Sequence, residues 1–107
     1  MDLNGPFSWS NASKGMWFKI LAQLGKLESL NRPQCAAQGS HDYAIADCSK
    51  KARDRFTDLK LDVQFDSVFS VRVEGKVRVI CIDLWPVLEL LWLDTNHEVY
   101  PSSKKHT

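Results

Sequence analysis

The stretch SVFSVRVEGKVRVICIDLWPVLELLWLD, residues 67–94, decides the fold. Between Phe69 and Glu74, apolar side chains alternate with polar ones, and this period of two is typical of a strand with one buried face. Turns are predicted at Glu74 and Gly75 and again at 84–86. The strands expected from this pattern cover residues 67–74, 76–83 and 87–94. No helix separates them, so we expect an antiparallel meander of three strands.

The last of these strands differs from the first two. From Val87 to Asp94 it is apolar on both faces except at Glu89. Continuous apolar runs are typical of strands that are covered on both sides. The pattern therefore predicts that residues 87–94 form a central strand.

Upstream of the meander, residues 14–30 show the period of a helix. Asn11 and Ser13 can accept hydrogen bonds from the exposed amides of the first turn. The apolar positions expected on the buried face are Met16, Trp17, Ile20, Leu21, Leu24, Leu27 and Leu30. Before this helix, residues 6–10 are predicted to form a short extended strand, and after it residues 31–39, with Pro33 and Gly39, read as a loop.

A second helix is predicted to begin between Ser40 and Ser49 and to run to about Lys60. Its expected apolar side carries Cys48, Ala52, Phe56 and Leu59. Residues 43–46 have two interpretations, the start of this helix or a short strand before a helix capped by Asp47 or Ser49. The whole order, a short N-terminal strand, two helices and a three-stranded antiparallel meander, predicts an α+β domain.

Composition limits the function classes. The chain has 107 residues, 44% of them apolar, and a net charge of +1. We expect one domain, residues 1–107, with flexible ends at 1–5 and 102–107. The small net charge argues against a protein dedicated to nucleic acid. The N-terminus does not have the pattern of a signal peptide and no apolar run is long enough for a membrane helix, which predicts a cytoplasmic protein with no membrane partner.

The sequence contains no motif for a metal or a cofactor. The three cysteines, Cys35, Cys48 and Cys81, follow no zinc or redox spacing and are expected to be buried free thiols. Phosphate-binding glycine loops, HExxH pairs and nucleophile elbows are also missing. We therefore predict no metal and no cofactor.

The first candidate site is an arginine pair in FSVRVEGKVRVI. If Val71 and Val73 face Val79 and Val77 across the hairpin, Arg72 lies directly opposite Arg78. Like charges in this arrangement repel unless an anion lies between them. Three interpretations follow: neutralisation by Glu74, Asp83 or Glu89, a site for an anion or phosphate on the open face of the sheet, or a different register of the hairpin. Lys76, at the start of the second expected strand, and Glu89 are further candidate binding residues.

The second candidate site is the chain end, DTNHEVYPSSKKHT, residues 94–107. A histidine near a carboxylate can act as a general base, and a tyrosine can orient a phosphate, so His97 and Tyr100 are candidate catalytic residues. The alternative is a plain strand exit at which His97 forms a hydrogen bond and Tyr100 packs on the sheet edge. Trp85, beside Pro86 in a turn, is a candidate interface residue, and an open sheet edge makes a homodimer reasonable.

The phrases FSVRVEGKVRVICI and LELLWLDTNHEVYP resemble the RelE/ParE toxin superfamily, in which RelE, YoeB and HigB cleave mRNA on the ribosome and ParE members poison gyrase. The resemblance covers residues 68–100 and rests on two helices, a meander with an arginine on each of its first two strands, and a histidine and tyrosine at its exit. The chain is also similar to short uncharacterised bacterial proteins with a phrase like LLWWDPxHxVxPS and a KKHT end. Here Leu93 replaces a tryptophan of that phrase and Thr95 replaces the proline.

The resemblance implies that Arg72 and Arg78 hold the scissile phosphate, that His97 is an acid or base and that Tyr100 assists. The toxins are strongly basic, however, whereas this chain has a net charge of +1. This mismatch favours an accessory binding protein on a RelE-like scaffold, from a bacterium or a mobile genetic element, with a protein partner or an antitoxin-like peptide. The alternative is a ribosome-dependent endoribonuclease, for which RNA and the ribosome are the partners.

Overall fold

The computed structural model of the chain describes residues 1–84 and 87–101. It is an α+β fold built on a four-stranded antiparallel sheet whose strands lie in the order β1-β2-β3-β4. The strands are β1 (His41–Ala44), β2 (Ser67–Glu74), β3 (Val77–Leu84) and β4 (Val87–Asp94). The α+β class and the antiparallel meander from residue 67 onward are as predicted. The sheet was expected to contain three strands. It contains four, because β1 pairs with β2 at one edge.

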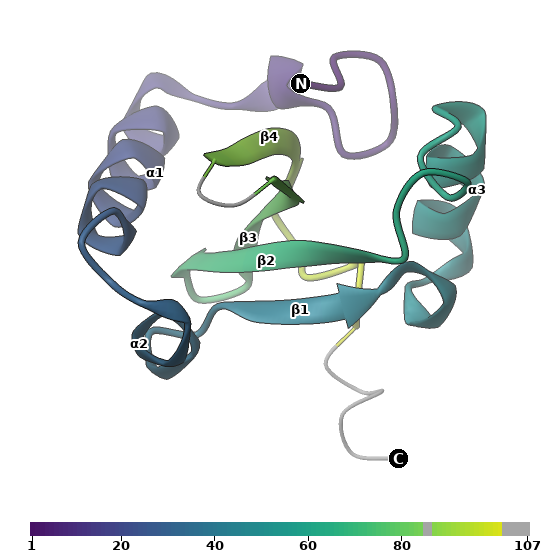
Figure 1. Ribbon diagram of the computed structural model, residues 1–107. Coiled ribbons are helices and arrows are strands. Elements are labelled where there is room, and N and C mark those ends of the chain that lie inside the picture. Colours follow the sequence, from purple (N-terminus) through teal and green to yellow (C-terminus); the bar gives the residue numbers. More distant parts are fainter. Residues whose placement is uncertain (85–86, 102–107) are drawn as a thin grey trace.

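Helices lie on opposite sides of this sheet (Figure 1). On one side are α1 (Lys14–Leu27) and the short α2 (Arg32–Ala37), and on the other is α3 (Lys50–Asp58). Alternation along the strands divides the core accordingly. Val68, Ile80 and Trp92 pack with Phe56 of α3. The opposite face buries Phe69, Val71, Val79, Cys81 and Leu93 with Ile20 and Leu27 of α1.

The cap and most of the buried face of α1 are as predicted. Ser13 is the N-cap, and its side chain accepts a hydrogen bond from the Met16 amide at 3.1 Å. Ile20 and Leu27 are buried, whereas Leu21 is exposed, so its predicted place in the core was wrong. Leu21 lies at the margin of the stripe formed by residues 20, 24 and 27, and that stripe already covers the sheet.

Residues 31–39 contain a helix rather than a loop. Asn31 and Gln34 form a reciprocal capping box at the start of α2, and Pro33 occupies the first turn, where its missing amide is not needed. The ambiguity at residues 43–46 resolves as a strand, β1, followed by a single 3-10 turn, η2 (Ile45–Asp47), and a helix capped by Ser49. Cys48, Ala52 and Phe56 are buried, as expected.

The N-terminal segment does not form the predicted strand at residues 6–10. It contains a 3-10 turn, η1 (Trp9–Asn11), and lies along the outer edge of β4. The Asp2 amide donates to the Leu91 carbonyl at 3.0 Å, and the Leu93 amide donates to the Phe7 carbonyl at 3.2 Å. β4 is therefore an edge strand of the sheet, not the predicted central strand. Both of its faces are apolar because each packs against one of the two core clusters, and the N-terminal segment covers its outer edge.

A bulge in β4 fits the strand to this cover. Ile80 pairs with Trp92 and Cys81 with Leu90, which leaves Leu91 without a partner on β3. The freed Leu91 carbonyl accepts hydrogen bonds from the Asp2 amide and from the Trp9 indole, the latter at 2.9 Å. The bulge thus supplies the acceptor by which the N-terminal segment is attached.

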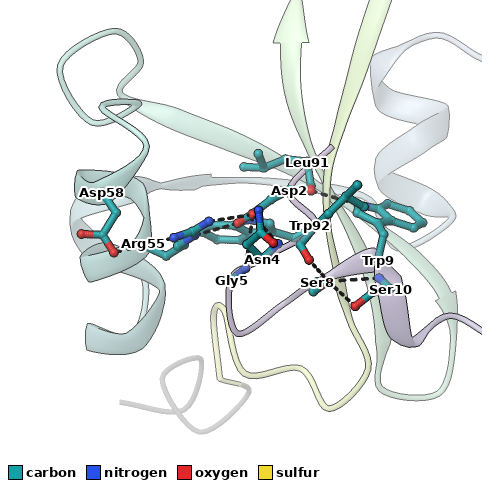
Figure 2. Close-up of polar contacts among 11 residues, drawn as sticks. Asp2, Asn4, Gly5, Ser8, Trp9, Ser10, Arg55, Asp58, Leu91 and Trp92 are labelled. Carbon is teal, nitrogen blue, oxygen red and sulfur yellow. Dashed lines mark hydrogen bonds and ion pairs between the residues drawn. The ribbon is translucent and has the colours of Figure 1, made fainter.

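Asp2 completes the attachment (Figure 2). Its carboxylate accepts two hydrogen bonds from the Arg55 guanidinium of α3, each at 2.8 Å, and one from the Trp92 indole at 2.9 Å. The Asp2 side chain is 3% exposed. Flexibility was predicted for residues 1–5, and within that range Asp2 joins three elements, the N-terminal segment, α3 and β4.

Candidate functional site

The arginine pair lies where β2 and β3 approach their connecting turn. Arg72 and Arg78 are direct register partners, and Val71 faces Val79, as predicted. The expected pairing of Val73 with Val77 was wrong, because Glu74 pairs with Val77 and Val73 is the extra residue of a bulge. Both arginines project from the face on which α3 lies, since they alternate with the valines that pack towards α1.

No carboxylate forms an ion pair with Arg72 or Arg78 within residues 1–84 and 87–101, although the buried Asp94, the register partner of Arg78, attracts its charge. Glu74 forms an ion pair with Lys19 at 2.9 Å, and neither Asp83 nor Glu89 is in ion-pair contact with Arg72 or Arg78. Arg78 instead donates to the carbonyls of Gly75 and Val77, at 2.7 and 3.1 Å. The ion-pair interpretation is therefore not supported, and two like charges remain side by side.

The two guanidinium groups differ in their surroundings. Arg72 is exposed, whereas Arg78 is half-buried. Burial is the main cause that lowers the pKa of Arg78, and the neighbouring Arg72 charge lowers it further, while Tyr43 and Asp94 act in the opposite direction. Arginine stays protonated despite such a shift. The site thus presents two fixed positive charges, one of them in a partly desolvated position where an anion would be attracted strongly.

Gly39 determines how closely the chain passes the Arg72 stem. It has φ +91°, a left-handed conformation that favours glycine, and a Cβ at this position would lie 2.9 Å from Arg72 Cδ and 3.1 Å from Arg72 Cβ. The loop after α2 is therefore in direct contact with the aliphatic part of Arg72. This contact limits the directions that the guanidinium can take.

Replacing Gly39 by alanine is expected to lower the free energy of unfolding by about 2 kcal/mol, because it combines a strained φ with a clash against Arg72. Urea unfolding measures the change. Gly25→Ala is the matched control: a Cβ there meets no atom within 4 Å, so alanine should stabilise α1 by about 0.5–1 kcal/mol. Equal effects of the two substitutions would contradict the assigned role of Gly39.

Aromatic rings lie beside the arginines on the same face. Tyr43 of β1 stacks on Tyr100, with ring centroids 4.0 Å apart and an angle of 6° between the ring planes. The ring centroid of His41 lies 6.1 Å from that of Tyr43. His41 pairs in register with Ser70, two residues before Arg72. The row His41, Tyr43 and Tyr100 therefore borders the arginine pair, and Tyr100 packs at the sheet edge as the strand-exit interpretation expected.

The chain leaves β4 through a turn organised by Asp94. Asp94 is 2% exposed, and its carboxylate accepts hydrogen bonds from the Glu98 and Val99 amides, at 2.9 and 2.8 Å. Asp94 is also the register partner of Arg78. His97, within this turn, has φ +58°, is 8% exposed, and both its ring nitrogens are buried. The catalytic roles of His97 and Tyr100 remain predictions.

The remaining predicted binding residues are dispersed. Lys76 is exposed in the β2–β3 turn, two residues from Arg78. Glu89 pairs with Ile82 towards the other end of the sheet, away from the arginines. Trp85 lies outside the described residues, as does the C-terminal end 102–107. The structure therefore groups Arg72, Arg78 and Tyr100 with Lys76 nearby, and it separates Glu89 from them.

Sequence reasoning missed three residues that shape the site, Gly39, Tyr43 and Asp94. Glycine after a capped short helix signals a left-handed C-terminal position, which could have marked Gly39 once α2 was recognised. Asp94 stands at the end of an apolar strand and before a polar turn, a place where an aspartate side chain often binds nearby backbone amides. Tyr43 carried no such signal, because its neighbours Val68 and Tyr100 come from β2 and the chain end.

Other kinds of site find little support in residues 1–84 and 87–101. No group of three or more histidine, cysteine or acidic side chains there is arranged to hold a metal ion. All three cysteines are buried and none forms a disulfide, and burial raises the pKa of the Cys81 thiol to about 12, so it is unreactive at neutral pH. Within the same residues, the helices are too short or too polar to cross a lipid bilayer.

What this geometry can do chemically is bind an anion. Two guanidinium groups on adjacent strands offer forked donors for a phosphate or carboxylate, with an aromatic row at one side. The chain has been compared with protein-family models, curated proteins and solved structures, and none of them matches.

Proposed function

We propose that the chain is a binding protein that holds an anionic group of its partner between Arg72 and Arg78. The observation that carries the proposal is that these arginines lie directly opposite each other without an ion-paired carboxylate. Such an arrangement is unfavourable for the free protein, because like charges across a strand pair destabilise the sheet. A bound anion would remove that repulsion, so the arginine pair is better explained by a ligand than by stability.

The proposal extends to the scaffold. An accessory interaction protein with a RelE-like scaffold, of mobile-element origin, is the reading that the sequence favours, and the antiparallel meander with its paired arginines supports it. The β1 strand and the N-terminal segment along β4 differ from the three-stranded scaffold that the sequence predicted. A protein or antitoxin-like peptide with an acidic segment is the partner we propose, and self-association into a homodimer is a further proposal.

The test is a titration of the protein with pyrophosphate and with an acidic peptide, followed by the NMR signals of the arginine Nε–Hε groups. We expect shifts at Arg72 and Arg78, and a loss of about tenfold in affinity for Arg72→Ala, since one charge-assisted pair is removed. Arg72 is exposed, so its loss does not threaten the fold. Lys14→Ala, which removes the same charge from α1, is the control and should leave the affinity unchanged.

The free energy of unfolding gives an independent test of the same substitution. Arg72→Ala should raise the free energy of unfolding of the ligand-free protein by about 0.5 kcal/mol, because it relieves the repulsion with Arg78. Unchanged affinity for both anions in Arg72→Ala would reject the proposal.

Expression in bacteria addresses the alternative. If the wild type arrests growth and Arg72→Ala does not, the endoribonuclease is the better reading and the anionic group is an RNA phosphate. Harmless expression together with anion binding supports the interaction protein. The buried place of His97 favours the second outcome, since a general base must reach its substrate.

A further inference from the structure

A cavity of about 370 Å³ lies on the other face of the sheet, between α1 and β4. Leu24 and Leu27 of α1 and Leu88 and Leu90 of β4 form most of its wall. Phe69 and Cys35 also line it, and Glu28 is the charged residue among its described lining. This face carries α1 rather than the arginine pair, so the cavity is separate from the site described above.

Size and lining suit a small molecule with an apolar body. Ligand cavities typically hold about 300–1,000 Å³ and are mainly apolar with few polar groups. Leu24, Leu88 and Leu90 are only partly buried, although they pack against the core. A ligand in the cavity would remove their remaining apolar surface from water, which is favourable.

Glu28 indicates the charge of that ligand. It is the C-cap of α1, where the helix already has a partial negative charge, so a carboxylate there opposes the helix dipole. No ion pair or side-chain hydrogen bond of Glu28 occurs within the described part of the chain, and Lys26, the nearest lysine in sequence, is not paired with it. A residue that breaks a local rule without a structural gain is a candidate for function.

We infer that this cavity binds a small amphipathic amine, with its apolar body among the leucines and its ammonium group at Glu28. The carboxylate and the negative helix end both attract a cation, and both repel an anion of the same shape. Among ligands of the same size, a cation should therefore bind more tightly than an anion. A neutral analogue should bind with intermediate affinity.

The experiment uses three probes with similar phenylalkyl bodies: phenethylamine, phenethyl alcohol and hydrocinnamate. Each is titrated into protein with labelled leucine methyl groups, and the signals of Leu24, Leu27, Leu88 and Leu90 are followed by NMR at low salt. We expect the amine to bind about fivefold more tightly than the alcohol, which is the size of a partly exposed ion pair, and the carboxylate more weakly than the alcohol. Absence of shifts with all three probes would overturn the inference.

Two kinds of variant separate charge from shape. Glu28→Gln should remove the preference for the amine and leave alcohol binding unchanged, whereas Asp66→Asn, with the same change in charge at an exposed position, should keep the preference. Leu88→Trp should fill the cavity and abolish binding of all probes, and Leu24→Phe does the same from the helix side if Leu88→Trp fails to fold. An amine preference that survives Glu28→Gln would refute the role of this carboxylate.

Discussion

Replacing Asp2 by asparagine is expected to lower the free energy of unfolding by about 3 kcal/mol, because it leaves the Arg55 guanidinium without its partner. Both Asp2 oxygens accept hydrogen bonds from Arg55, and one also accepts from the Trp92 indole (Figure 2). The Asp2 side chain is buried and that of Arg55 is 21% exposed, so the estimate is at the lower end for a broken buried pair. Urea unfolding at neutral pH measures the loss.

The same contact predicts how stability depends on pH. The Arg55 hydrogen bonds hold the pKa of Asp2 well below its ordinary value of 3.8, against the opposing effect of burial. Because the folded-state pKa is depressed, the contribution of Asp2 is complete above the ordinary value and is lost as the pH falls towards the lowered one. The difference in stability between wild type and Asp2→Asn should therefore be constant from about pH 6 to 8 and shrink below about pH 4.

Asp58 provides the matched control. Its carboxylate lies 3.9 Å from the same guanidinium, but its side chain is 67% exposed. Asp58→Asn should change the free energy of unfolding by less than about 0.5 kcal/mol, since exposed pairs contribute little. If both variants lose the same stability, burial of the Asp2 pair is not what holds the N-terminal segment on β4.

The meander and α1 could be predicted because their signals are local. A period of two from Phe69 to Glu74, and apolar steps of three and four before residue 30, reflect which side chains share a face. The opposition of Arg72 and Arg78 was also accessible, since pairing Val71 with Val79 keeps the apolar face together, although the expected pairing of Val73 with Val77 was wrong. These inferences needed only residues close in sequence.

The edge strands of the sheet and the segment that covers β4 could not be predicted, because they depend on contacts between residues distant in sequence. β4 was taken for a central strand since nothing in residues 87–94 reveals that the N-terminal segment supplies its outer neighbour. β1 has four residues and pairs only with β2, which is too short for a clear period. The bulge at Leu91 likewise becomes meaningful only when Asp2 and Trp9 are seen to use its carbonyl.

Only part of the candidate site could be predicted from the sequence, for the same reason. Its arginines come from one hairpin, whereas the Tyr43 and Tyr100 stack joins residues 57 positions apart through β1 and the chain exit. Nor did the sequence show that His97 is buried and has a left-handed φ in the turn held by Asp94. Asp94 is therefore the residue through which the fold controls this side of the site.

Asp94→Ala is expected to lower the free energy of unfolding by about 3 kcal/mol, because it removes the charged acceptor of two backbone hydrogen bonds and leaves the buried Val99 amide unsatisfied. Asparagine should restore only part of the loss, since its carbonyl can accept but its amino group cannot.

The structural consequence of Asp94→Ala is specific to the exit turn. Hydrogen exchange should accelerate at the Glu98 and Val99 amides more than in β2 or β3, because the turn loses its anchor while the ladder of the sheet remains. Glu98→Gln is the control within the same turn: its side chain pairs with Lys51 at 2.7 Å but is 44% exposed, so a change below about 0.5 kcal/mol is expected. Uniform acceleration across the sheet would mean that Asp94 supports the whole fold. Selective acceleration would show that it fixes the exit segment that places Tyr100 beside the arginine pair.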